Sequence, residues 1–142
     1  MPSQVDVQNA LVGTWSLLEY KSALPDGGGT HYPMGQEARG IITYAPNGYM
    51  AVQLTPAVNK KCKERINDFL AYSGPYWCEK QPDGFTIVNH RAAMCSAPEF
   101  EGSIQHRVVR FADDKLILAS PTFVDLEVSN LVSAIAIPLD GE

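Results

Sequence analysis

Short runs in which apolar and polar residues alternate recur along the chain, with turn residues between them. An alternation of period two puts every second side chain on the same face of a strand. On this basis the sequence predicts strands at 13–22, 39–45, 49–55, 72–79, 85–93, 103–111, 115–120 and 128–137. Several short strands joined by tight turns are typical of an all-β, antiparallel protein.

Three turns share one sequence pattern, which strengthens the all-β prediction. They are Pro25-Asp26-Gly27, Pro46-Asn47-Gly48 and Pro82-Asp83-Gly84. Proline presets φ for the second position of a type I turn, Asn or Asp tolerates the third, and glycine takes the left-handed conformation that returns the chain. We therefore expect a hairpin at each of these places.

One segment departs from the strand pattern. Between Pro56 and Ala71 the apolar residues fall near helical spacing among charged ones, which predicts one short amphipathic helix. In a barrel this helix is expected across a mouth or on the outside. The apolar positions are Val58, Cys62, Ile66, Phe69 and Leu70.

Composition and charge narrow the class. A chain of 142 residues fits one domain over 1–142, with residues 1–10 as an exposed lead-in, and 45% hydrophobic residues provide a core. The net charge is −5 and the cations form no dense patch, which argues against nucleic acid as a partner. No apolar run is long enough to cross a bilayer, so we expect no membrane partner.

The cysteines and the N-terminal residues indicate a reducing compartment. Cys62, Cys78 and Cys95 are odd in number and have no chelating spacing. Residues 1–9 lack the basic and apolar regions of a secretory signal. We expect reduced thiols and a cytoplasmic protein, and we predict no metal site. No motif for a nucleotide, flavin, NAD or haem is present, so no cofactor is predicted.

Several motifs together resemble a known family. They are Gly13-Thr14-Trp15, Tyr32-Pro33-Met34-Gly35, Ala38-Arg39-Gly40, Tyr44-x-x-x-Gly48-Tyr49-Met50, Gln53, Tyr72-x-Gly74-x-Tyr76 and His90. From about Leu11 to Ser120 the chain is similar to the lipocalin-like domain family of bacteria and fungi. The resemblance implies a single lipocalin-like antiparallel β-barrel, closed at one end by Trp15. Members of the family are often accessory proteins, some of them in natural-product pathways, and the resemblance implies no single chemistry.

The hairpin around Gly48 has two alternative inner faces. Tyr49 and Gln53 share one face, and Met50, Val52 and Leu54 share the other. The first set suits a polar lumen and the second suits an apolar ligand, so the sequence leaves the choice open. Tyr44 and Tyr76 are further candidate ligand-binding residues.

Three basic residues are the candidate catalytic groups. His90 suits proton transfer, although a lone histidine on a strand is often only hydrogen-bonded. Arg39 could hold an anion with its planar fork or lie in solvent at the rim. Arg107 shares a strand face with Gln105, and an interior arginine there needs a partner such as Glu79 or a bound anion. Surface exposure is the alternative for this pair.

These observations favour a barrel that binds a small, largely apolar organic molecule. The leading hypothesis is a cofactor-free cyclase, isomerase or dehydratase of specialised metabolism, which uses shape and a few placed donors. A non-catalytic carrier and a protein–protein accessory domain are the alternatives. The oligomeric state, a homodimer included, is left open. Convergent ionisable side chains in the lumen favour the enzyme, an apolar lumen favours the carrier, and a collapsed lumen favours the interaction domain.

Overall fold

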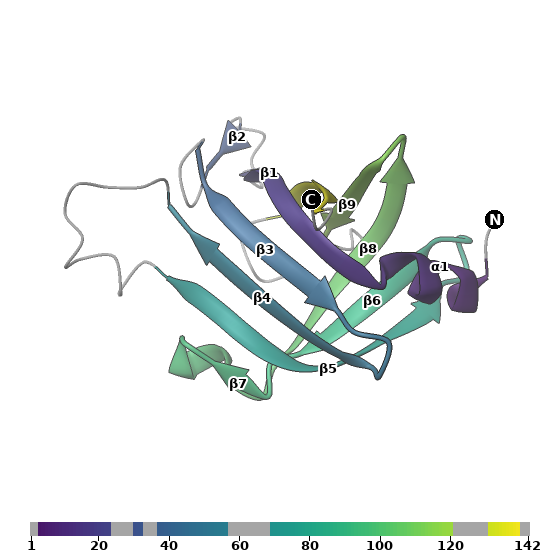
Figure 1. The fold of residues 1–142 in the computed structure, drawn as a ribbon, viewed down its shortest axis with the longest axis horizontal. Helices are drawn as coiled ribbons and strands as arrows, with labels where there is room; N and C mark the ends of the chain where they lie inside the picture. The colour runs from purple at the N-terminus through teal and green to yellow at the C-terminus, as the bar shows by residue number, and fades with distance from the viewer. Residues whose placement is uncertain (1–2, 24–29, 33–36, 57–68, 121–130, 140–142) are drawn as a thin grey trace.

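The chain folds into a closed antiparallel barrel in the computed structural model, which describes residues 3–23, 30–32, 37–56, 69–120 and 131–139 (Figure 1). Eight strands form its wall. They are β1 (Gly13–Ala23), β3 (Arg39–Tyr44), β4 (Tyr49–Thr55), β5 (Leu70–Lys80), β6 (Thr86–Arg91), β8 (Ile104–Ala112), β9 (Lys115–Ala119) and β10 (Leu131–Pro138). The predicted strands are confirmed, and most of their ends fall within two residues of the prediction.

The first strand closes the barrel by pairing with a neighbour on each side. One side of β1 pairs with β3, where Trp15 lies opposite Ile42, and the other side pairs with β10, where Trp15 lies opposite Pro138. The register with β10 shifts between Leu17 and Glu19. Two short strands, β2 (Thr30–His31) and β7 (Met94–Cys95), pair with β1 and β5 outside the main circuit.

The turn chemistry predicted from the sequence is present at both described hairpins. Gly48 and Gly84 have φ values of 90° and 92°, in the left-handed region that favours glycine. In each turn the preceding Asn47 or Asp83 side chain accepts a hydrogen bond from the backbone two residues on. The turn at Pro25 lies outside the described residues.

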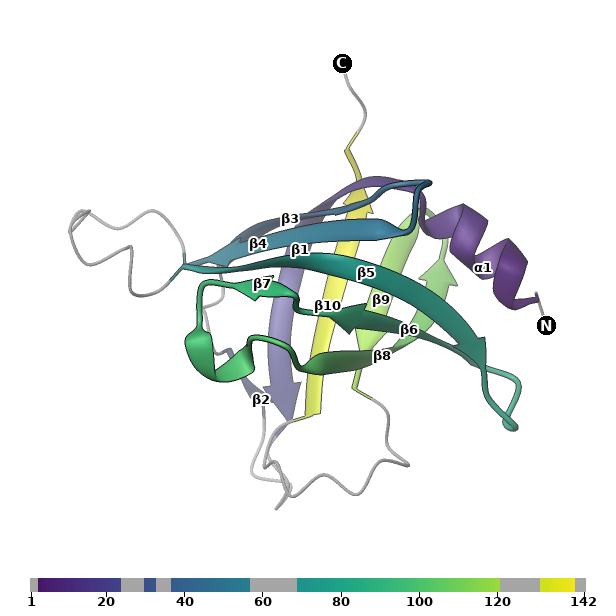
Figure 2. The same cartoon turned by 90° about the horizontal axis from the view of Figure 1, so that it is seen from below.

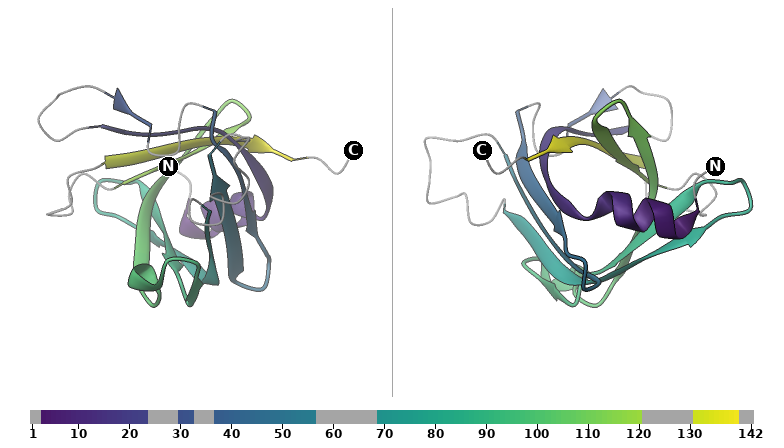
Figure 3. Two further views of the ribbon diagram at one scale, coloured as in Figure 1. Left: turned by 90° about the vertical axis from the view of Figure 1, so that its left-hand side faces the viewer. Right: turned by 45° about the vertical axis from the view of Figure 1, so that its right-hand side comes forward.

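A helix closes one end of the barrel, and the sequence analysis did not expect it. Residues Gln4–Leu11 form α1, which begins with a capping box between Ser3 and Asp6. Its Val7 and Leu11 are 6% and 0% exposed, whereas Ser3, Val5, Asp6, Asn9 and Ala10 are exposed, so the predicted lead-in contains a helix with one buried position among its described residues. An eight-residue helix is marginal alone, and burial of its apolar face supplies its stability. The right-hand view of Figure 3 shows α1 across the barrel end.

Trp15 joins this helix to the barrel. Its indole Nε1 donates to the backbone oxygen of Leu11 over 2.9 Å, and its ring lies 6.2 Å from that of Phe111. Trp15 is buried in one core cluster with Val7 and Leu11. The prediction that Trp15 stands at the closed end is therefore confirmed.

The alternation of β4 settles which of its faces lines the interior. Met50 and Val52 are buried, whereas Tyr49 is 56% exposed and Gln53 is exposed. The apolar set thus lines the lumen and the polar set faces outward. This arrangement is expected because side chains fill most of the interior of a narrow eight-stranded barrel.

The helix predicted between Pro56 and Ala71 is only partly testable. Residues 57–68 lie outside the described residues, and Leu70 and Ala71 belong to strand β5, so the predicted helix does not extend to them. Among the described residues, no helix has the length and apolar character needed to cross a membrane.

Candidate functional site

A cavity of about 210 Å³ lies inside the barrel, away from the end that α1 closes. Its walls are mostly apolar, and the polar groups come from β1, β5, β6 and β8. The segment from β7 through the 3₁₀ turn η2 (Pro98–Phe100) contributes to one side. The lining residues are Tyr20, Ile42, Val52, Leu54, Leu70, Tyr72, His90, Ala92, Cys95, Phe100, Gln105, Arg107 and Leu118.

A hydrogen-bonded chain of three side chains crosses the barrel interior and ends on this cavity. The hydroxyl of Tyr44 lies 2.6 Å from Nε2 of His90, and the hydroxyl of Tyr72 lies 2.9 Å from its Nδ1. Tyr44 and His90 are 1% and 2% exposed. Because both ring nitrogens are occupied by protein hydroxyls, His90 reaches a ligand's polar atoms through Tyr72.

The burial of Tyr44 fixes the direction of the hydrogen bonds. His90 is the one hydrogen-bond partner that its hydroxyl has among the described residues. If Nε2 were protonated, the Tyr44 hydrogen would lack an acceptor, which costs roughly 1–3 kcal/mol in a buried site. Tyr44 therefore donates to Nε2, and Nδ1–H donates to the Tyr72 oxygen.

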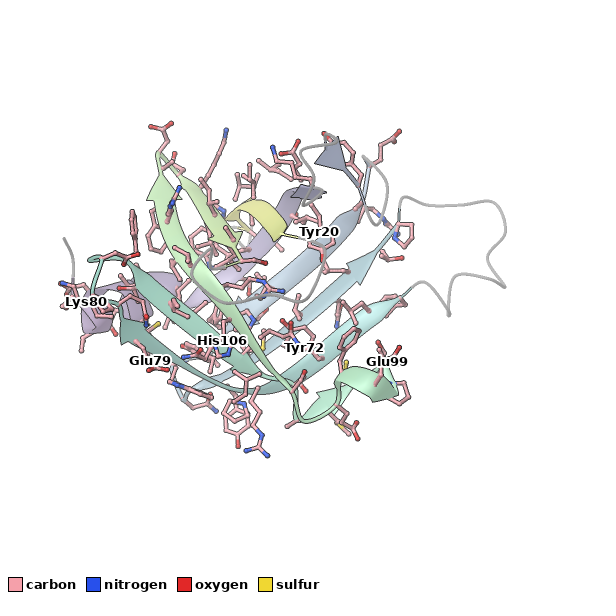
Figure 4. The ribbon with its side chains drawn as sticks, turned by 180° about the vertical axis from the view of Figure 1, so that it is seen from behind. Tyr20, Tyr72, Glu79, Lys80, Glu99 and His106 are labelled. Atoms are coloured by element: carbon pink, nitrogen blue, oxygen red, sulfur yellow. The ribbon has the colours of Figure 1, made fainter. Side chains whose placement is uncertain are left out.

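This direction leaves the hydroxyl hydrogen of Tyr72 free to point into the cavity. Figure 4 labels Tyr72 on β5 and Tyr20 on β1, two different walls of the barrel. A donor at the end of a hydrogen-bonded chain is polarised by the bonds behind it. Tyr72 is thus a pre-oriented donor for an oxygen atom of a ligand.

Burial keeps the whole chain uncharged near neutral pH. Desolvation, with a smaller effect from Arg107, lowers the pKa of His90 to about 3. Desolvation raises the pKa of Tyr72 to about 12 and raises that of Tyr44 well above its usual value. The pKa of Tyr20 is also raised by burial. A neutral imidazole between two neutral phenols is the state that these shifts favour.

Arg107 supplies the positive charge of the cavity. It is half-buried, and Nη1 donates to the backbone oxygen of His106 over 2.7 Å, with a long contact of 3.5 Å from Nη2 to Oε1 of Gln105. No carboxylate of the described residues lies within 4 Å of the guanidinium. The expected partner Glu79 instead lies on the outer face. Arg107 keeps unused donors and an unneutralised charge beside Tyr72.

Some of the predicted site residues line the cavity, and others lie behind its wall or on the outer face of the barrel. His90, Arg107 and Gln105 line the cavity. Tyr44 lies behind His90, and Tyr76 packs edge-on against Tyr44 at 4.9 Å while donating to the backbone oxygen of Ala45. Arg39, Tyr49 and Gln53 are exposed on the outer face and do not line this cavity, so of the alternatives left open for them the outward-facing one holds. Arg39 and Gln53 border a separate hollow there.

Sequence reasoning missed Tyr72, Tyr20 and Phe100 as lining residues. Tyr72 could have been found, because it shares a strand face with Tyr76, which the sequence made a candidate ligand-binding residue. Tyr20 could not, because the register shift between Leu17 and Glu19 changes which residues of β1 face inward. Phe100 lies in a loop, for which periodicity gives no direction.

A second histidine network lies on the outside of the same strands. Nδ1 of His106 is 2.6 Å from Oδ1 of Asn89, whose Nδ2 donates to Oε1 of Glu79 over 2.7 Å. Trp77 also donates to this carboxylate. Because a carboxylate only accepts, the Asn89 amide is oriented by Glu79, and His106 must donate from Nδ1. Figure 4 labels Glu79 and His106 at this face.

One of the free thiols, Cys95, lines the cavity. Cys78 is also a free thiol, and Cys62 lies outside the described part of the chain. Burial raises the pKa of Cys78 to about 11, which leaves it a protonated thiol within the core. The described residues contain no group of three or more His, Cys, Asp or Glu that could hold a metal ion.

The closed barrel and its cavity define a small ligand-binding β-barrel protein. More particularly, the chain belongs to the lipocalin-like domain family, whose model matches residues 12–134. The resemblance stated from the motifs is therefore confirmed, and this fold fits the binding of a small molecule. No curated protein and no solved structure matches the chain.

Proposed function

We propose that the protein binds a small, largely apolar metabolite in the barrel cavity and catalyses its cofactor-free cyclisation, isomerisation or dehydration in specialised metabolism. One observation carries this proposal. The chain Tyr44–His90–Tyr72 ends on the cavity beside Arg107, which has no carboxylate partner among the described residues. Ionisable side chains converge on the lumen, as an enzyme requires and a simple carrier does not.

The catalytic contribution comes from hydrogen-bond donation. The Tyr72 hydroxyl and the Arg107 guanidinium stabilise negative charge that develops on a substrate oxygen during the reaction. Complete proton transfer along the chain would leave a phenolate on Tyr44, whose raised pKa opposes this. Tyr72 therefore acts as a strong donor, and His90 and Tyr44 position it.

The apolar walls supply the second contribution. Leu54, Leu70 and Leu118 line the cavity together with the ring of Phe100. A flexible substrate held in one folded pose has lost entropy before it reacts, which lowers the barrier of a ring closure. The walls thus select the reactive pose while the two donors act on the oxygen.

A non-catalytic carrier is the second candidate function. The apolar majority of the lining favours it, because such walls bind a metabolite without acting on it. The third candidate, a protein–protein accessory domain, is disfavoured by the cavity, since such a domain needs no open lumen. The free thiols of Cys78 and Cys95 support a reducing, cytoplasmic location.

Native mass spectrometry of the freshly purified protein tests the proposal. We expect a co-purified small molecule, which is identified and then incubated with wild type and with Tyr72→Phe. An enzyme converts it, and the variant is expected to be slower by about 10²-fold while it still folds. A bound molecule that wild type returns unchanged would establish the carrier and overturn the catalytic proposal.

A further inference from the structure

Two polar groups that face the cavity, the Tyr72 hydroxyl and the Arg107 guanidinium, offer hydrogen-bond donors to a ligand. Tyr72 presents a hydrogen, because its oxygen already accepts from Nδ1 of His90. Arg107 presents only donors, and Oε1 of Gln105 is directed toward Arg107 while its Nε2 donates to Ser103. A ligand that meets Tyr72 and Arg107 must therefore bring an acceptor to them.

The described lining of the cavity carries a positive charge and no negative one. Arg107 is the one permanently charged side chain among the described lining residues, and that lining contains no carboxylate. A half-buried guanidinium without a counter-charge is unfavourable unless an anion neutralises it. The outer face shows the contrast, since Lys21 there pairs with Glu19 at 3.2 Å.

We propose that the ligand is an acidic ring compound that presents a delocalised oxyanion, a phenolate or an enolate, to Tyr72 and Arg107. This inference rests on the proposed function for the location of the site, and it adds the chemical class of the substrate. The single oxygen of such an anion has lone pairs enough to accept from the Arg107 guanidinium and from the Tyr72 hydroxyl at the same time. The ring lies against Leu54, Leu70 and Phe100.

The size of the cavity agrees with a single ring system. Pockets for drug-sized ligands are roughly 300–1,000 Å³. The present cavity is about 210 Å³, which suits a smaller molecule of one ring and short substituents. An enolate or phenolate of this size is the anionic form of an acidic carbonyl or phenol, on which the two donors can also act during a reaction.

A chromogenic phenol that ionises near neutral pH provides the test. We choose 4-nitrophenol, whose phenolate is followed by its visible absorbance, and 4-nitroanisole as a neutral compound of similar shape. If the inference is right, the folded protein binds the phenolate at least 10-fold more tightly than the phenol, so the apparent pKa of the bound probe falls by about one unit or more. The neutral ether binds more weakly than the phenolate.

Three variants localise this selectivity. Arg107→Gln is expected to remove the preference for the phenolate, and Arg107→Lys is expected to retain part of it, because the charge remains without the fork. Arg91→Gln is the matched control, since Arg91 is exposed on the outer face of β6 and does not line the cavity. Circular dichroism verifies that each variant is folded.

The outcomes separate the inference from the proposed function. Equal or tighter binding of the phenol or the ether would overturn the oxyanion class and leave the cavity as the binding site. An unchanged phenolate preference in folded Arg107→Gln would overturn the role of Arg107. If wild type binds none of the three compounds, the inferred class and the proposed site are both contradicted.

Discussion

The two histidine networks occupy the inside and the outside of the barrel wall at two shared strands, β5 and β6, which supply side chains to both. Inside, His90 is held between the phenols of Tyr44 and Tyr72. Outside, His106 is held by Asn89, which is in turn held by the carboxylate of Glu79. Figure 2 shows these strands side by side in the barrel wall. Each network orients one histidine ring. The inner network does so with phenol hydroxyls and the outer network with an amide and a carboxylate.

The difference follows from the cost of burying charge. A carboxylate can end the outer network because Glu79 is exposed and water solvates it. A carboxylate inside the barrel would pay a large desolvation penalty, whereas a phenol stays neutral there and still makes its hydrogen bond. The inner network is therefore built to deliver a neutral donor to the cavity, and the positive charge beside it is left for a ligand.

The largest expected effect is on turnover. Tyr72→Phe removes the donor that faces the cavity and should lower kcat by about 10²–10³-fold, the scale of a lost oxyanion donor. His106→Gln alters the outer network and should change kcat by less than about 2-fold. Steady-state kinetics on the substrate recovered with the protein provides the comparison. Equal losses in the two variants would remove the functional distinction between the networks.

The next effect is a dependence of stability on pH to which the inner histidine, His90, contributes. Because the pKa of folded His90 is about 3 and that of an unfolded histidine is about 6.5, the unfolded state binds the proton first. His90 therefore lowers the free energy of unfolding as the pH falls from about 6.5 toward 3. Between pH 6 and 4 this contribution is about 2–3 kcal/mol.

Urea denaturation at several pH values measures this contribution. His90→Gln removes the titrating ring, and we expect the difference in stability between wild type and variant to change by that amount between pH 6 and 4. His106→Gln serves as the control variant on the outer face. A difference that stays constant with pH would show that folded His90 titrates as it does in the unfolded chain.

The smallest effect is on stability. It follows from changing one hydrogen-bonding side chain in each network, Tyr44 in the inner one and Glu79 in the outer one. Tyr44→Phe leaves Nε2 of His90 buried without its donor, and we expect a loss of about 1–2 kcal/mol in the free energy of unfolding. Glu79→Gln on the exposed face should cost less than about 0.5 kcal/mol. Thermal and urea unfolding distinguish the two. A Tyr44→Phe protein as stable as wild type would show that water or another group satisfies Nε2.

Most of the barrel was predictable because its determinants are local. Alternation gave the strands, and the Pro-Asn-Gly and Pro-Asp-Gly patterns gave the described hairpins. Helix α1 was missed because its capping signal at Ser3 is short and its burial depends on packing against β5 and β6, which are distant in the sequence. Its stability is a tertiary effect, which periodicity does not carry.

The site was only half predictable for a similar reason. Alternation shows that Tyr49 and Gln53 lie on the same face of their strand. It does not show whether that face points toward the core or toward solvent. His90 and Arg107 were identified by residue type. The hydrogen-bonded chain of Tyr44, His90 and Tyr72 was not predictable, because it depends on the registers that connect β3, β4, β5 and β6.

Nitrogen-15 NMR of the histidine rings at pH 5 tests the central claim most directly, with His90→Gln used to assign the signal. The account predicts a neutral His90 ring that is protonated on Nδ1 and accepts a hydrogen bond at Nε2, although an ordinary histidine is mostly charged at that pH. A ring protonated on Nε2, or a doubly protonated ring, would contradict the account, because Tyr72 would then not be fixed as a donor to the cavity.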